Sequence, residues 1–140
     1  MLVYEVFEAA LKKSKKAERI KILKDNESWA LKDVLRGMYD ESIVWNLPPG
    51  EPPYRANEGH NAPTNLLREN TKFTYFLTGG KGDKLPAMKR EGIFIAMLEG
   101  VHNKDAELLI KMVNKEKFKG ITRPMINEAF PGLLRDEPLK

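Results

Sequence analysis

Apolar residues recur every three or four positions along most of this chain, the spacing that places them on one face of an α-helix. The first such stripe consists of Val3, Val6, Phe7, Ala10 and Leu11. The alternation of apolar and polar residues that is typical of strands is not sustained anywhere, and the chain has no internal repeat. The sequence therefore predicts an all-α fold.

The length of 140 residues fits one compact domain, 1–140, with about six or seven helices. Serine, threonine and asparagine mark several helix starts, because their side chains accept hydrogen bonds from the free N–H groups of a first turn. Trp29, Trp45 and the six phenylalanines fall at positions expected to face the core. The residues expected to begin the later helices are Ser14, Ser28 or Asn26, Thr64, Pro86, Asn103 and Thr122.

Residues 40–63, the proline-rich crossing, interrupt the helical pattern. This segment holds five of the nine prolines, and proline lacks the backbone donor that a helix interior needs. Its apolar side chains, Ile43, Trp45, Leu47 and Tyr54, are expected to hold it against the helices. We therefore predict an ordered, extended connection between two groups of helices.

Composition excludes several kinds of site. The chain has no cysteine and two histidines, His60 and His102, so a thiolate or histidine-rich metal centre is not expected. No apolar run approaches the length of a membrane span, and the N-terminal segment lacks the basic leader of a signal peptide. We expect a cytoplasmic protein that binds no membrane.

No catalytic constellation is found either. The glycine-rich turn at 79–84 does not match a phosphate-binding loop, which requires G-x-x-x-x-G-K-[ST] between a strand and a helix. Asp105 lies in the expected first turn of a helix, where a carboxylate stabilises the helix dipole. The sequence predicts a non-enzymatic protein with no cofactor and no metal.

Positive charge is concentrated in blocks, although the net charge is only +4. Residues 12–24 contain seven basic residues and one acid, and Lys15, Lys16 and Arg19 belong to this block. Residues 25–58 contain three basic residues and seven acids. Such blocks indicate a dipolar surface with a positive face suited to an anionic partner. The alternative is a set of solvated helix faces with no ligand.

Residues 117–123, the basic corner, lie between the last two expected helices. Lys117, Lys119 and Arg123 surround Gly120, which allows close approach of a backbone, and Thr122, which is the expected cap of the last helix. The free N–H groups of a helix start attract anions. The corner is therefore a candidate phosphate site, and an ordinary turn with solvated lysines is the alternative.

Several motifs occur in an order that points to a known family. They are 16–26 (KAERIKILKDN), 29–39 (WALKDVLRGMY), Ile43 with Trp45, 105–109 (DAELL), 120–122 (GIT) and 127–133 (NEAFPGL). Together they resemble the N-terminal DNA-binding domain of ATP-dependent DNA ligases, especially those of tailed bacteriophages. The chain is also similar to small proteins of cyanobacterial T4-like phages. The resemblance spans nearly the whole chain.

The resemblance implies an all-α module that grips the phosphates of duplex DNA without reading its sequence, in the cytoplasm of a bacterial host. The residues that would contact DNA are Lys117, Lys119, Gly120, Thr122, Arg123, Lys15, Lys16 and Arg19. The ligase nucleophile belongs to a K-x-D-G motif in a following domain, and the near match Lys81-Gly82-Asp83 has the wrong spacing. We therefore expect no adenylation by this chain.

A second function is compatible with the same fold. A protein–protein adaptor would bind a phage or host replication or transcription protein in place of DNA. Its contact surface would be the acidic, proline-rich crossing, through Trp45, Tyr54 and Arg55 if these side chains are exposed.

Overall fold

The computed structural model describes residues 1–135, and this part of the chain is helical. The last five residues of the expected domain, 136–140, lie outside it. Within the described residues the only β pairing is an isolated bridge between Trp45 and Leu77. The α-helices are α1 (Val3–Leu11), α2 (Lys16–Asp25), α3 (Trp29–Tyr39), α4 (Leu66–Glu69), α5 (Ala87–Gly100), α6 (Asn103–Val113) and α7 (Arg123–Ala129). Short 3-10 helices are η1 (Gly59–Asn61), η2 (Asn70–Tyr75) and η3 (Lys81–Lys84). The predicted all-α class is confirmed.

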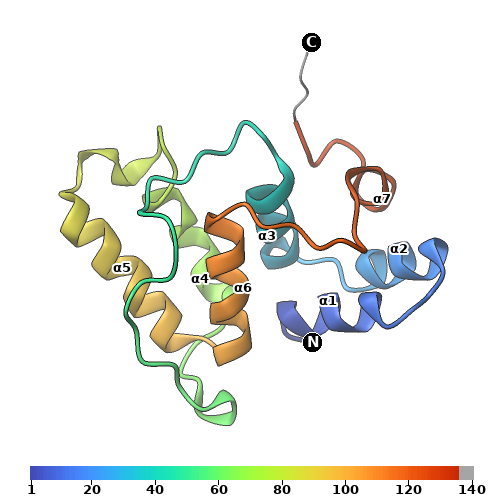
Figure 1. The fold of residues 1–140 in the computed structure, drawn as a ribbon, viewed down its shortest axis with the longest axis horizontal. Coiled ribbons are helices and arrows are strands. Elements are labelled where there is room, and N and C mark those ends of the chain that lie inside the picture. Colours follow the sequence, from blue (N-terminus) through green and yellow to red (C-terminus); the bar gives the residue numbers. More distant parts are fainter. Residues whose placement is uncertain (136–140) are drawn as a thin grey trace.

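Helix α3 lies at the centre of the molecule, against α6 (Figure 1). Helix α5 packs on the other side of α6, whereas α1, α2 and α7 form a separate group at the opposite end. The central position of α3 follows from its composition, because its apolar side chains occupy a wide face and are fully buried. They are Ala30, Leu31, Val34, Leu35 and Met38.

Three predicted helix starts are confirmed, and one of them is Pro86, which directly precedes α5. The Ser28 hydroxyl accepts a hydrogen bond from the Leu31 N–H at 3.1 Å, which caps α3. The Thr122 hydroxyl accepts one from the Met125 N–H at 3.4 Å, which caps α7. Both contacts supply an acceptor to a first-turn donor that has no partner inside its own helix.

Three other predicted starts were wrong by one residue. Asn65, not Thr64, caps α4 by accepting from the Arg68 N–H at 3.1 Å, while the Thr64 hydroxyl bonds Glu69. The expected fourth helix is also short, because α4 ends at Glu69 and continues as the 3-10 helix η2. The residues that precede α2, α4 and α6 are Lys15, Asn65 and His102 in place of Ser14, Thr64 and Asn103.

The proline-rich crossing runs in extended form over α6 and α5 (Figure 1). The Trp45 indole N–H donates to the Gly37 carbonyl at 3.0 Å. Farther along, the backbone of Gly50 and the side chain of Asn114 exchange two hydrogen bonds, of 2.8 and 3.0 Å. The Arg55 N–H then donates to the Glu99 carboxylate at 2.8 Å. The crossing is thus fastened to α3, α6 and α5 in turn.

The expectation that Trp29 faces the core was wrong, since 68% of this residue is exposed. Trp29 is the first residue of α3 and lies beside the buried stripe of that helix, not within it. The Lys32 ammonium group lies 5.0 Å from its ring centroid. Trp45 is partly buried and packs against the core as expected.

Candidate nucleic-acid interface

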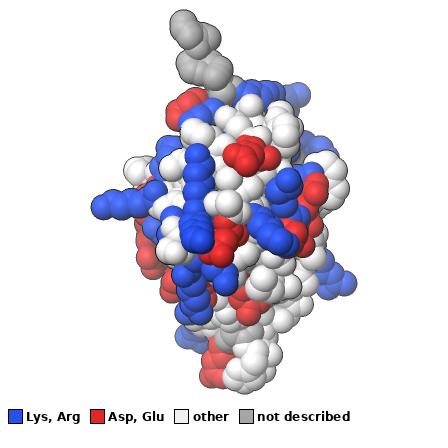
Figure 2. All heavy atoms as spheres, turned by 90° about the vertical axis from the view of Figure 1, so that its right-hand side faces the viewer, with Lys and Arg blue, Asp and Glu red and all other residues white. Residues whose placement is uncertain are grey.

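The lysine-rich segment, residues 12–24, and the basic corner lie side by side, although about a hundred residues separate them in the chain. The Arg19 guanidinium joins them, because its Nη1 donates to the Gly120 carbonyl and its Nε to the Lys13 carbonyl, each at 2.8 Å. Helix α2 also packs against α7. Figure 2 shows the face of the molecule that carries these helices, with many lysine and arginine side chains and some acids between them. The tertiary structure thus brings two of the predicted basic segments together.

Four lysines of the predicted site are exposed: Lys15, Lys16, Lys117 and Lys119. We call them the lysine group. None of them forms an ion pair within the described residues, although the Lys117 ammonium lies 6.0 Å from the Tyr39 ring centroid. A lysine head that is exposed and has no acidic partner keeps its charge available to an anion.

Arg123 and Thr122 instead hold the fold together. The Arg123 Nη1 donates to the Tyr39 carbonyl at the end of α3, and its side chain is half-buried. The Thr122 hydroxyl is occupied as the cap of α7, which has only seven residues. The Arg123 guanidinium therefore has a structural role at the end of α3.

Packing within the fold also explains why residue 120 is glycine. A Cβ at this position would lie 2.5 Å from the Arg19 Nη1 and 2.7 Å from the Leu11 Cδ2. Both distances are shorter than a van der Waals contact, so a side chain here would displace the Arg19 guanidinium and the end of the Leu11 side chain. The missing side chain of Gly120 makes room for the Arg19 guanidinium, so packing within the fold accounts for glycine at this position without a bound phosphate.

The end of α3, next to the basic corner, collects positive charge. The Lys115 ammonium donates to the Asp40 carbonyl at 2.8 Å, and Arg123 donates to the carbonyl before it. The C-terminal end of a helix carries partial negative charge and its last carbonyls lack intrahelical donors. Burial lowers the pKa of Lys115. Part of the positive charge predicted from composition thus stabilises this helix end.

The Asp40 carboxylate is fully buried at the same place. Burial alone would raise its pKa, but hydrogen bonds from the Ser42 hydroxyl, the Ser42 N–H and the Arg135 N–H outweigh burial and lower it. Their lengths are 2.6, 2.8 and 3.1 Å. Sequence reasoning missed this carboxylate, and its signal was the D-x-S spacing directly after a helix, which is typical of a side chain that bonds the backbone two residues on.

The residues of the adaptor alternative are unequally exposed. Trp45 and Tyr54 pack against the core, whereas Arg55 is exposed. Across residues 1–135 no three histidine, cysteine or acidic side chains are grouped so as to hold a metal ion. No helix in that range has the length and apolar character needed to cross a bilayer.

Comparison with curated proteins found no match. The model of a family of unknown function, DUF6433, matches residues 6–119. The match covers the lysine group, α6 and all of α1 except its first turn. It ends one residue before Gly120. Because the match extends over most of the sequence, the chain belongs to this family of unknown function.

Proposed function

We propose that the protein binds the phosphate backbone of duplex DNA, without sequence preference, through the lysine group. The observation that carries the proposal is the pair of Arg19 hydrogen bonds, which fasten the lysine-rich segment to the basic corner and so combine two positive segments on one face. The resemblance of the sequence to the DNA-binding domain of DNA ligases supports the same function.

The chemistry of the lysine group fits phosphate better than base edges. Lysine ammonium groups on flexible stems act as point charges and do not fix the bidentate geometry that reads a base. Binding of this kind releases condensed counterions and depends steeply on salt. Each of the four lysines that meets one phosphate contributes about −0.9 to the slope of log K against log salt, or roughly −3.6 in total.

The test is a fluorescence-anisotropy titration of two duplexes of unrelated sequence at several salt concentrations. We expect equal affinities for the two duplexes and a salt slope near −3.6. Replacing Lys15, Lys16, Lys117 and Lys119 together by alanine should remove most of the slope and weaken binding about a hundredfold or more at 0.1 M salt.

A matched control carries the same change of charge at the other end of the molecule. Lys72, Lys81, Lys84 and Lys89 are exposed and lie on η2, η3 and α5. Their joint replacement by alanine should leave the salt slope nearly unchanged. Equal losses in the two quadruple variants, or a strong preference for one duplex, would contradict the proposed site.

A further inference from the structure

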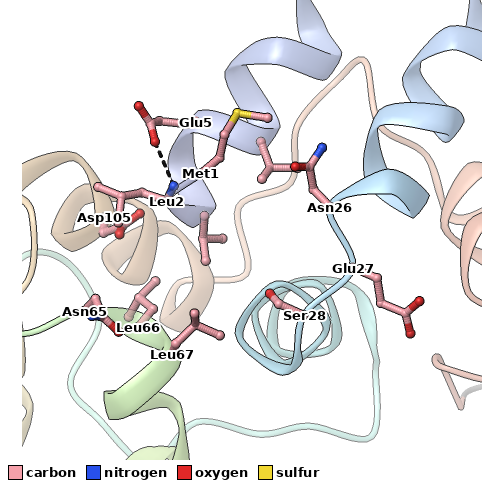
Figure 3. A pocket seen from close by; sticks show the side chains of 12 residues that line it. Met1, Leu2, Glu5, Asn26, Glu27, Ser28, Asn65, Leu66, Leu67 and Asp105 are labelled. Atoms are coloured by element: carbon pink, nitrogen blue, oxygen red, sulfur yellow. Dashed lines mark hydrogen bonds between the residues drawn. The ribbon is translucent and has the colours of Figure 1, made fainter.

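A pocket of about 570 Å³ opens beside the start of α1. The starts of α1, α3 and α4 and the first turn of α6 meet there (Figure 3). In this view Asp105 lies beside Leu2 on one side of the pocket, and Asn26 and Glu27 lie on the other. No residue of the lysine group lines this pocket, so the inference is independent of the proposed DNA binding.

The distinctive group in this pocket is the Asp105 carboxyl, which is fully buried. Its Oδ1 accepts a hydrogen bond from the Tyr4 N–H at 2.9 Å, in the first turn of α1. Its Oδ2 has no hydrogen-bond partner within the described residues. A buried acceptor without a donor costs free energy, and such groups are rare in folded proteins. Asp105 therefore offers one unused acceptor to a ligand that carries a donor.

The charge of the lining favours a cationic donor. Three acids line the pocket, Glu5, Glu27 and Asp105, and the one cationic group on its lining residues is the N-terminal ammonium of Met1. Two of these acids already have partners, because Glu5 accepts from the Leu2 N–H at 2.7 Å and Glu27 pairs with Lys32. Of the three acids, only Asp105 has a buried oxygen without a hydrogen-bond partner in residues 1–135, so the unmet demand for a donor lies at this carboxyl.

The rest of the lining favours a hydrocarbon arm on that cation. Val3, Val6 and Leu66 are buried at the pocket wall, and the more exposed Leu67 continues the apolar surface toward solvent. Transfer of methylene groups from water onto such a surface is favourable, by roughly 0.8 kcal/mol for each that is fully buried. A hydrated metal ion would make no use of this wall, and no group of side chains in residues 1–135 is arranged to hold one.

We propose that this pocket binds a primary alkylammonium group, whose N–H donates to the Asp105 Oδ2 while its methylene chain lies along Val6 and Leu66. The primary amine is the matching chemistry because it supplies both a positive charge and N–H donors. A quaternary ammonium ion has the charge without the donors, and a neutral alcohol has the donor without the charge.

The protonation of Asp105 agrees with this assignment. Burial raises its pKa to about 6, against the lowering effects of the Tyr4 N–H and of nearby His102, and Glu5 raises it further. At pH 7.5 the carboxyl is therefore ionised and can accept from a cation, whereas at pH 5 it is mostly protonated. Ammonium binding should accordingly weaken about tenfold between these two pH values.

The first experiment titrates the ¹⁵N-labelled protein with n-butylammonium chloride at pH 7.5 and follows amide chemical shifts. Shifts should concentrate at Tyr4, Leu66 and Asp105, and the signal should saturate. The matched probe is n-butyltrimethylammonium, which has the same charge and arm but no N–H. It should bind at least about tenfold more weakly, because it leaves the Oδ2 acceptor unsatisfied. Equal binding of both probes, or no localised shifts with either, would overturn the proposal.

Two variants then test whether Asp105 binds the ammonium group. Asp105→Asn should weaken n-butylammonium binding about tenfold or more. Glu107→Gln removes an equal charge from an exposed position of the same helix and should leave binding within about twofold. If the asparagine variant does not fold, the comparison of pH 7.5 with pH 5 in the unmodified protein decides the question, and pH-independent binding refutes the role of Asp105.

Two sources could present this group, a free amine or a lysine side chain of another protein. Titrations with 1,4-diaminobutane and with N-acetyl-lysine methylamide distinguish them. Tighter binding of the diamine indicates a small-molecule amine, and tighter binding of the lysine derivative indicates a peptide side chain. Failure of both to bind would refute the proposed ligand class.

Discussion

Asp40 and Asp105 are both fully buried, yet their surroundings are opposite. Asp40, at the end of α3, accepts hydrogen bonds from Ser42 and Arg135, and these bonds outweigh burial and lower its pKa. Among residues 1–135, Asp105, which lines the pocket beside the start of α1, accepts only from the Tyr4 N–H, and burial raises its pKa to about 6. The number of donors around each carboxylate, and not its depth, decides which protonation state the fold favours.

The same difference distinguishes the two regions as candidate sites. At the end of α3 the polar groups largely have partners, since Lys115 and Arg123 donate to the last carbonyls of that helix. Only the exposed lysines around it are available to a phosphate. At the pocket the opposite holds, because the buried Asp105 Oδ2 has no donor within the described part of the chain. From residue types alone, the basic surroundings of the α3 end would be preferred to the pocket as a ligand site.

The largest effect that tests this comparison is expected from Asp105→Asn. The pKa of Asp105 in the folded protein, about 6, lies above its ordinary value of 3.8, so the folded state holds this proton more tightly than the unfolded state. Ionisation of Asp105 therefore destabilises the fold as the pH rises from about 4 through 6. Asparagine cannot ionise. The free energy of unfolding of the variant minus that of the unmodified protein should therefore be larger at pH 7.5 than at pH 4, by up to roughly 3 kcal/mol.

Urea unfolding of both proteins at the two pH values measures this difference. The difference between the proteins isolates Asp105, because the other carboxyl groups titrate in both. A constant difference across the pH range would mean that Asp105 has an ordinary pKa, and the contrast with Asp40 would be lost.

Asp40→Asn should act in the opposite sense and somewhat less strongly. Its folded-state pKa lies below the ordinary value, so ionised Asp40 contributes stability at neutral pH that is lost as the pH falls through the acid range. The variant replaces one acceptor oxygen by an amide that faces donors from Ser42 or Arg135. We expect a loss of about 2 kcal/mol in the free energy of unfolding at pH 7, decreasing toward pH 3. A stability gain at neutral pH would contradict the account of this helix end.

Helices could be predicted from the sequence because their determinants are local. The stripes of α1, α3 and α6 and the caps Ser28 and Thr122 need only neighbouring residues to be recognised. Errors arose where two adjacent residues were equally suited to cap a helix, as Thr64 and Asn65 were at the start of α4. The exposure of Trp29 was not predicted, because a first helical residue lies at the margin of the stripe and only tertiary packing decides on which side it falls.

The candidate sites were predictable only in part. The positive charge of the lysine group is visible in the sequence, but the hydrogen bonds that occupy Arg19 and Arg123 join segments about a hundred and about eighty residues apart. Asp105 shows the same limit. Its place in a first helical turn is a local feature, whereas its bond to Tyr4 and its unpartnered oxygen depend on how α1 packs against α6. No spacing rule reveals such contacts.

The smallest expected effect distinguishes the two roles that Gly120 could have. If the absence of a side chain serves packing, Gly120→Ala places a Cβ 2.5 Å from the Arg19 Nη1 and displaces the guanidinium from the Gly120 carbonyl. The free energy of unfolding should then fall by about 1 kcal/mol, the net contribution of one hydrogen bond. In an Arg19→Ala background the same substitution should cost less, since only the Leu11 contact remains to be relieved. A double-mutant cycle by urea unfolding measures this coupling, and anisotropy titrations on the same four proteins report the affinity for DNA. Coupled losses of stability with little change in DNA affinity fit the packing role. A loss of DNA affinity at full stability would instead show that a phosphate approaches Gly120, and the basic corner would then be a ligand site in its own right.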